Sequence, residues 1–124
     1  MNLIEVRDKL AAVLAPVADS DPDVLSSIVD AIEPPALMLS WGDPWLEPRT
    51  ACFKDGRLVV TCVASRLAPG DGIAQLEELV AYTLDRLEAD PGDWPLDSVG
   101  GPSMFTLAKT NYLAARITVR VIVT

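Results

Sequence analysis

The segment from Asp97 to Thr124 constrains the fold more than any other part of the chain. A Gly-Gly-Pro turn at Gly100–Pro102 leads into a short apolar strand, a tight turn at Lys109–Asn111 and a long strand from Tyr112 to Val123. The long strand is rich in β-branched residues, which favour strands because their side chains pack well on a pleated surface. This pattern predicts a β-hairpin that forms the backbone of a sheet. The long strand holds no group suited to catalysis, which favours a role in assembly.

Two arginines mark one face of this predicted long strand. Arg116 and Arg120 alternate with Thr118, and successive side chains of a strand point to opposite faces. The opposite face carries apolar residues, namely Ile117, Val119, Val121 and Val123. The arginine face is either solvated or in contact with another subunit, and the sequence favours neither alternative.

Two segments have the apolar periodicity of amphipathic helices. The first covers residues 2–15 and is stopped by Pro16, and the second covers residues 73–89. A third segment, residues 23–33, is ambiguous. Its apolar stripe follows a proline-containing cap and slightly favours a helix, whereas residues 27–32 also suit an extended segment.

Strand signals occupy the middle of the chain. Residues 36–41 form a compact apolar run that predicts a buried strand, and residues 42–49, rich in Pro and Trp, predict a loop. The segments 50–54 and 57–65 flank Asp55-Gly56, a strong signal for a two-residue hairpin turn.

These elements predict a single domain over residues 1–124 with an α+β fold. We expect a mostly antiparallel sheet of four to five strands, with two amphipathic helices packed on one face. The sequence has no apolar run approaching the roughly 18 residues that a membrane-spanning helix needs, and its first residues lack the pattern of a secretory signal. We therefore expect a soluble protein without a membrane partner.

The sequence contains none of the usual patterns of catalytic or metal-binding residues. It has no histidine, the commonest base for activating a nucleophile and the commonest metal ligand. Cys52 and Cys62 are expected on adjacent strands, where two reduced thiols are favoured over a disulfide. Glu77 and Glu78 resemble a carboxylate pair, but they lie on the polar side of the second predicted helix, which favours a solvated face. We expect no enzyme activity, no cofactor and no metal site.

The formal net charge of −8 argues against nucleic acid as a ligand. Sequence-independent affinity for DNA comes from Lys and Arg side chains that neutralise phosphates, and this chain has no run of them. An acidic surface either aids solubility, which is the simpler interpretation, or prevents the protein from sticking to DNA beside it.

The candidate interface residues are Trp41, Asp43 and Trp45 in the predicted loop, together with Arg116 and Arg120 on the last strand. Tryptophan and arginine are the residues that most often anchor protein interfaces. The alternative for the indoles, including that of Trp94, is that they cover the ends of the hydrophobic core.

Three stretches resemble the small tail terminator proteins of long-tailed phages, especially phages that infect actinobacteria. One stretch is the proline-led strand Pro34–Leu39 with the Pro/Trp loop that follows it. Another is the strand end Val63–Ser65 with its turn into the helix Ala74–Leu79. The most specific is Asp97–Ser103 with the hairpin that continues through Asn111–Val119. Together these stretches span nearly the whole chain.

The resemblance implies structural work. Such proteins close the growing tail tube as a ring, commonly of six subunits, and dock to the head connector. The implied partners are further copies of the chain, the tail tube protein and the head connector or stopper protein, while DNA passes through unbound. The implied location is the tail–neck region of the virion, after assembly in the host cytoplasm. The family fold, a small α/β sandwich, implies that residues 26–32 are extended. The family shares no catalytic residues, so none is carried over.

Two alternatives remain open. One is a head-completion or stopper protein of the phage neck. The other, from a different class, is a small bacterial adaptor that binds one partner through the segment from Trp41 to Trp45.

Overall fold

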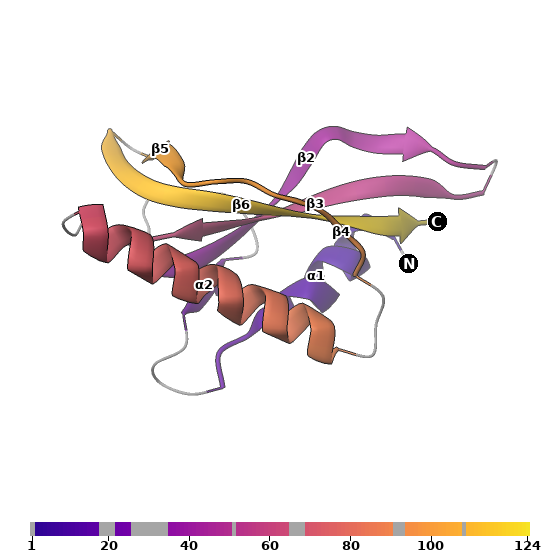
Figure 1. The fold of residues 1–124 in the computed structure, drawn as a ribbon. Coiled ribbons are helices and arrows are strands. Elements are labelled where there is room, and N and C mark those ends of the chain that lie inside the picture. The colour runs from indigo at the N-terminus through magenta and orange to yellow at the C-terminus, as the bar shows by residue number, and fades with distance from the viewer. Residues whose placement is uncertain are drawn as a thin grey trace.

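In the parts of the chain that the structure describes, two helices and six strands build an α+β fold (Figure 1). The computed structural model describes residues 2–17, 22–25, 35–50, 52–64, 69–90, 94–107 and 109–124. In chain order the elements are α1 (Leu3–Leu14), β1 (Asp23–Leu25), β2 (Ala36–Pro48), β3 (Lys54–Val63), α2 (Pro69–Ala89), β4 (Leu96–Val99), β5 (Ser103–Leu107) and β6 (Thr110–Val123). The fold class predicted from the sequence is confirmed, and the sheet has six strands where four to five were expected.

The strands follow the order β1-β2-β3-β6-β4, and β5 also pairs with β6. β1 runs parallel to β2, whereas the other pairs are antiparallel. β4 and β5 occupy successive stretches of the same partner, because Val99 lies opposite Ile117 and Ser103 lies opposite Ala114. Residues 100–102 interrupt what is otherwise one long edge strand. The predicted closing hairpin is confirmed, and β4 is a strand that the sequence reading had left in a connecting segment.

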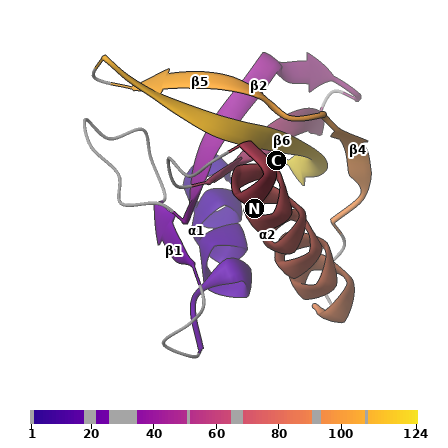
Figure 2. The same ribbon diagram turned by 60° about the vertical axis from the view of Figure 1, so that its left-hand side comes forward.

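Both helices lie on the same side of the sheet, α1 towards β1 and α2 towards β4 (Figures 1 and 2). The side chain of Asn2 caps α1 by accepting a hydrogen bond from the backbone N–H of Glu5 at 2.9 Å. The Tyr82 hydroxyl of α2 donates to the carbonyl of Leu14 at 3.0 Å and so ties the two helices together. Both predicted helices are confirmed, and α2 begins four residues earlier than the periodicity indicated.

The main hydrophobic core lies between the helices and the inner face of the sheet. Its buried residues include Val6, Leu10 and Leu14 from α1, Leu76, Leu79 and Leu87 from α2, and Leu37, Leu39, Leu58, Val60, Cys62, Ile117 and Val119 from the strands. Thr83 is also buried, and its hydroxyl is satisfied by donating to the carbonyl of Leu79 at 2.9 Å. A smaller cluster around Val63 and Ala114 lies on the other face of these strands.

The helix that the pattern slightly favoured over residues 23–33 is wrong at its start. Residues 23–25 form β1, in which Val24 lies opposite Leu37 and Leu25 opposite Met38. Pairing with a buried strand outweighs the local helical periodicity, because tertiary contacts routinely override intrinsic propensity. Residues 26–34, and with them the extended segment implied by the family resemblance, lie outside the described residues.

The predicted loop at residues 42–49 and the predicted turn at Asp55-Gly56 are also wrong. β2 continues to Pro48 after a register shift between Trp41 and Leu46, and Gly56 lies inside β3 opposite Leu46 and Val121. Pairing on both sides of Gly56 outweighs its turn propensity. Prolines are tolerated in this half of β2 because, past Met38, the described strands pair with it on one edge only.

The turn between β2 and β3 lies instead at residues 49–53. The backbone N–H groups of Arg49 and Thr50 both donate to the carbonyl of Phe53, at 3.1 and 3.0 Å. The Thr50 hydroxyl accepts from the N–H groups of Cys52 and Phe53. Cys52 is therefore exposed in a turn and not on a strand beside Cys62, which is buried, and both thiols are free.

No helix in the described ranges is both long and apolar enough to cross a membrane.

Candidate interaction face

The face of the sheet opposite the helices, called the outer face below, carries the two arginines that the sequence marked as interface residues. On β6, Arg116 and Arg120 are exposed while Ile117 and Val119 are buried, as the alternation predicted. Arg57 of β3 lies directly opposite Arg120 across the strand pair. The outer face therefore brings three guanidinium groups together over the centre of the sheet.

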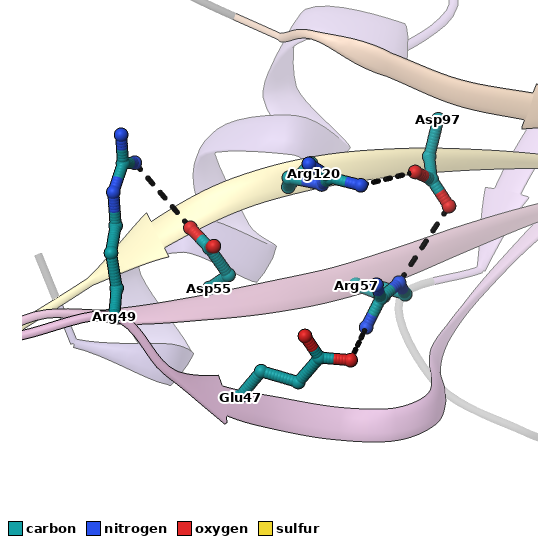
Figure 3. Close-up of polar contacts among 6 residues, drawn as sticks. All are labelled: Glu47, Arg49, Asp55, Arg57, Asp97 and Arg120. Atoms are coloured by element: carbon teal, nitrogen blue, oxygen red, sulfur yellow. Dashed lines mark hydrogen bonds and ion pairs between the residues drawn. The ribbon is translucent and has the colours of Figure 1, made fainter.

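Four of the charged side chains here form a continuous chain of ion pairs (Figure 3). Arg57 donates to Glu47 at 2.8 Å and lies 3.6 Å from Asp97, which in turn accepts from Arg120 at 2.7 Å. The hydrogen bond to Glu47 raises the pKa of Arg57, and the charges of Glu47 and Asp97 raise it further. Asp97 thus links the edge strand β4 to the two central strands.

The ion pairs compensate for like charges that the strand register places side by side. Glu47 lies opposite Asp55, and Arg57 lies opposite Arg120. Like charges directly opposite each other destabilise a sheet. Arg49 binds Asp55 at 3.4 Å, and Asp97 bridges the two arginines, so each like-charged pair is neutralised by a third residue (Figure 3).

The two tryptophans of the predicted loop stack on each other across the irregularity in β2. The ring centroids of Trp41 and Trp45 are 5.8 Å apart with 30° between their planes. Trp41 is half-buried against the core, whereas Trp45 is 51% exposed. Such a stacked pair presents a large apolar surface with little side-chain entropy to lose on binding.

A hollow of about 540 Å³ lies on the outer face between these groups. Its lining includes Trp41, Asp43 and Arg116 together with Arg57 and Asp97 of the ion-pair chain. The hydroxyl-bearing residues Ser40, Ser98 and Thr118 complete the polar part of the lining. Among the described residues, Asp43 and Arg116 make no ion pair with each other or with any other side chain. They therefore offer one negative and one positive group to a partner.

The structure gathers all five predicted interface residues into one region. Trp41, Asp43 and Arg116 line the hollow, Trp45 stacks on Trp41, and Arg120 binds the Asp97 that lines it. Trp94 instead covers the edge of the hydrophobic core, which was the alternative expected for the indoles, because it is partly buried and packs against the core. Its indole N–H donates to Asp90 at 2.8 Å, and Lys9 lies 5.8 Å from its ring.

Sequence reasoning missed Glu47, Arg57 and Asp97. Glu47 was placed in a loop, Arg57 beside a turn and Asp97 in a connecting segment, so none had an assigned face. The alternation of side chains along β3 could have placed Arg57. It lies two residues before Val59 and four before Thr61, so all three side chains belong to the same face of the strand. Asp97 carried no such signal, because β4 is short and its register shifts between Leu96 and Ser98.

In the described parts of the chain, no cluster of three or more His, Cys, Asp or Glu side chains is placed to hold a metal ion. Burial raises the pKa of the Cys62 thiol to about 11, with a weaker opposing effect from Thr83, so the thiol stays protonated near neutral pH. What the outer face offers is a preorganised set of charges beside an aromatic stack, which suits recognition of a protein surface.

Comparison with known proteins finds no family model and no curated protein that matches the chain.

Proposed function

We propose that this protein is a structural component of a phage virion that ends the tail tube as a ring and joins it to the head connector. The observation that carries the proposal is the outer face. Its hollow and its ion-pair chain, with the Trp41–Trp45 stack beside them at the irregularity in β2, form a fixed surface suited to binding protein. The family resemblance of the sequence supports the same role.

The charge distribution supports the proposed passage of DNA through the ring. α2 carries five carboxylates and one arginine between Pro69 and Ala89, a net charge of 5 − 1 = 4 negative units. A surface of this sign repels the DNA backbone. We expect no retardation of duplex DNA by the protein at about 0.1 M salt, an ionic strength that leaves phosphate-mediated binding measurable.

The proposed function is tested by adding the purified protein to tail tubes assembled in vitro. Capped tubes should stop elongating, carry a ring at one end in electron micrographs, and bind the head connector. Native mass spectrometry gives the number of subunits in the ring. A protein that stays monomeric and leaves tube growth unchanged would refute the role. A ring located on the head side of the neck would instead identify a head-completion or stopper protein.

The second candidate is a small adaptor that binds one partner through the segment from Trp41 to Trp45. The exposed Trp45 indole favours it. Replacing Trp45 with Ala should abolish binding by an adaptor while leaving its monomeric state unchanged. In a tail terminator, the same substitution should weaken docking to one neighbour of the neck and leave tube capping measurable through the other contacts.

A further inference from the structure

A second surface, on the helix side of the molecule, is an apolar groove between α2 and the edge strand. Its volume is about 470 Å³. One wall consists of Ile73, Val80 and Leu84 of α2, and the other includes Val99 at the end of β4 and Pro102 of the β4–β5 connection. Ile73 and Val99 are each 42% exposed, so the apolar floor reaches solvent. The groove belongs to neither the outer face nor the proposed docking hollow.

Two features define what fits this groove. Glu77 is the one charged residue that lines it, and the helix that forms its wall has a net charge of −4 as counted above. The other wall is an edge strand, since β4 has no second neighbour among the described strands. Edge strands present unpaired backbone groups to a further segment. The groove therefore suits a short extended or turn segment with an apolar residue and positive charge.

The turn between β2 and β3 has this chemistry. Phe53 is 43% exposed at its end and is followed directly by Lys54. Arg49 of the same turn binds Asp55 at 3.4 Å, so residues 49–55 keep a net charge of 2 − 1 = +1. Other exposed apolar residues have a different setting: Ile4, for example, is followed directly by Glu5. The turn also projects from the end of the sheet away from the first turn of α2, at the opposite side of Figure 1. It is placed to reach a neighbouring molecule.

From these complementary surfaces we infer that the β2–β3 turn of one copy, led by Phe53, docks into the α2–β4 groove of the next copy. The inference rests on the ring proposed above and names the contact between its subunits. Because turn and groove are different surfaces, the contact is heterologous, and repeated heterologous contacts close into a ring when the rotation between copies allows it. Burial of Phe53 against Ile73 and Val99 would supply the apolar part of the contact, and Glu77 would face the positive turn.

The native thiols provide a direct test. Cys52 adjoins Phe53 and is exposed, whereas Cys62 is buried and unavailable to reagents. Ile73→Cys places a second thiol in the groove. Treatment of this variant with a short bismaleimide, alone and on tail tubes, should produce a ladder of covalent oligomers. Adding Cys52→Ser should abolish the ladder. The matched control, Ala12→Cys, places the thiol on an exposed position of α1 and should give no ladder.

Mixing two complementary variants tests the direction of the contact. Phe53→Asp removes the turn's anchor and Val99→Asp spoils the groove, so neither variant should assemble alone. Each retains one intact surface, and an equimolar mixture should form heterodimers of twice the 13.3 kDa chain mass and nothing larger. Circular dichroism should show both variants folded, since both positions are exposed.

Absence of the ladder above the Ala12→Cys control, or oligomers of unchanged size in both aspartate variants, would overturn the turn–groove contact. The two proposals fail differently. If the wild-type protein forms rings that cap tail tubes while Ile73→Cys gives no ladder, this contact is overturned and the proposed function stands. If Ile73→Cys gives the ladder but the wild-type protein never caps tubes, the contact is supported and the tail-terminator role is refuted.

Discussion

The buried thiol of Cys62 makes the stability of this protein depend on pH in a range that can be calculated. The thiol lies in the main core, fully buried beside Thr83, and its pKa is raised to about 11 from a reference value of 9.0. In the unfolded chain it is solvated and titrates near the reference value. Below pH 9 both states hold the proton, so the thiol contributes no pH dependence there. Above pH 9 only the unfolded state ionises, which favours unfolding until the folded thiol also titrates near pH 11.

The size of the effect follows from the two pKa values. At pH 10 the unfolded thiol is mostly ionised and the folded thiol mostly protonated, a ratio of about ten that corresponds to about 1.4 kcal/mol. By pH 11 the loss should approach about 2 kcal/mol. The measurement is urea unfolding at several pH values between 8 and 11, for the wild type and for Cys62→Ala.

Cys62→Ala removes the titrating group, so its free energy of unfolding should fall less steeply with pH than that of the wild type. Loss of packing in this variant adds a constant offset and leaves the difference in slope unchanged. Cys52→Ala is the matched control, because it removes the other thiol from an exposed turn and should leave the wild-type slope intact. Parallel curves for the wild type and Cys62→Ala would refute the reasoning.

Three further substitutions test the packing and the ion pairs. Asp97→Ala should destabilise the sheet because two arginines then lose their shared carboxylate. A double-mutant cycle with Arg120→Ala, measured by urea unfolding, should give a coupling free energy of about 0.5 kcal/mol that shrinks at high salt. A coupling of zero would contradict the 2.7 Å contact. Ile117→Ala leaves a cavity at a fully buried site and should cost about 3 kcal/mol by the same assay, whereas a cost near zero would mean that the core is loosely packed there. Gly56→Ala places a Cβ 3.2 Å from a methyl group of Val121 and should lower the melting temperature measured by calorimetry. An unchanged melting temperature would show that the Val121 side chain moves aside without cost.

The parts of the fold that follow from local periodicity could be predicted from the sequence. The two helices and the β5–β6 hairpin carry their own patterns, and the inward and outward faces of β6 follow from simple alternation. The turn at Asp55-Gly56 shows where local signals fail. Its dipeptide favours a turn, but the strand partners of Gly56 on both sides come from distant parts of the chain.

The candidate site divides in the same way. Residue type alone singled out four of the interface candidates, namely Arg116, Arg120, Trp41 and Trp45. That they lie around one hollow could be learned only from the tertiary structure. Asp97, which binds both Arg57 and Arg120, has nothing in its sequence surroundings that marks it out. Its role depends on the register of β3 and β6, which places Arg57 opposite Arg120. No local sequence pattern predicts that pairing.

The position of β6 has a consequence for how the molecule is made. This strand contacts β3 on one edge and both β4 and β5 on the other, so residues 110–123 form an interior strand on which three other strands depend. During synthesis, β2 and β3 leave the ribosome well before their central neighbour exists, and the inner edge of β3 waits unpaired. A chain that ends before residue 110 would lack the strand with which β3, β4 and β5 all pair. Such a chain could not form the complete sheet that neighbouring molecules would bind, so incomplete subunits would not enter an assembly.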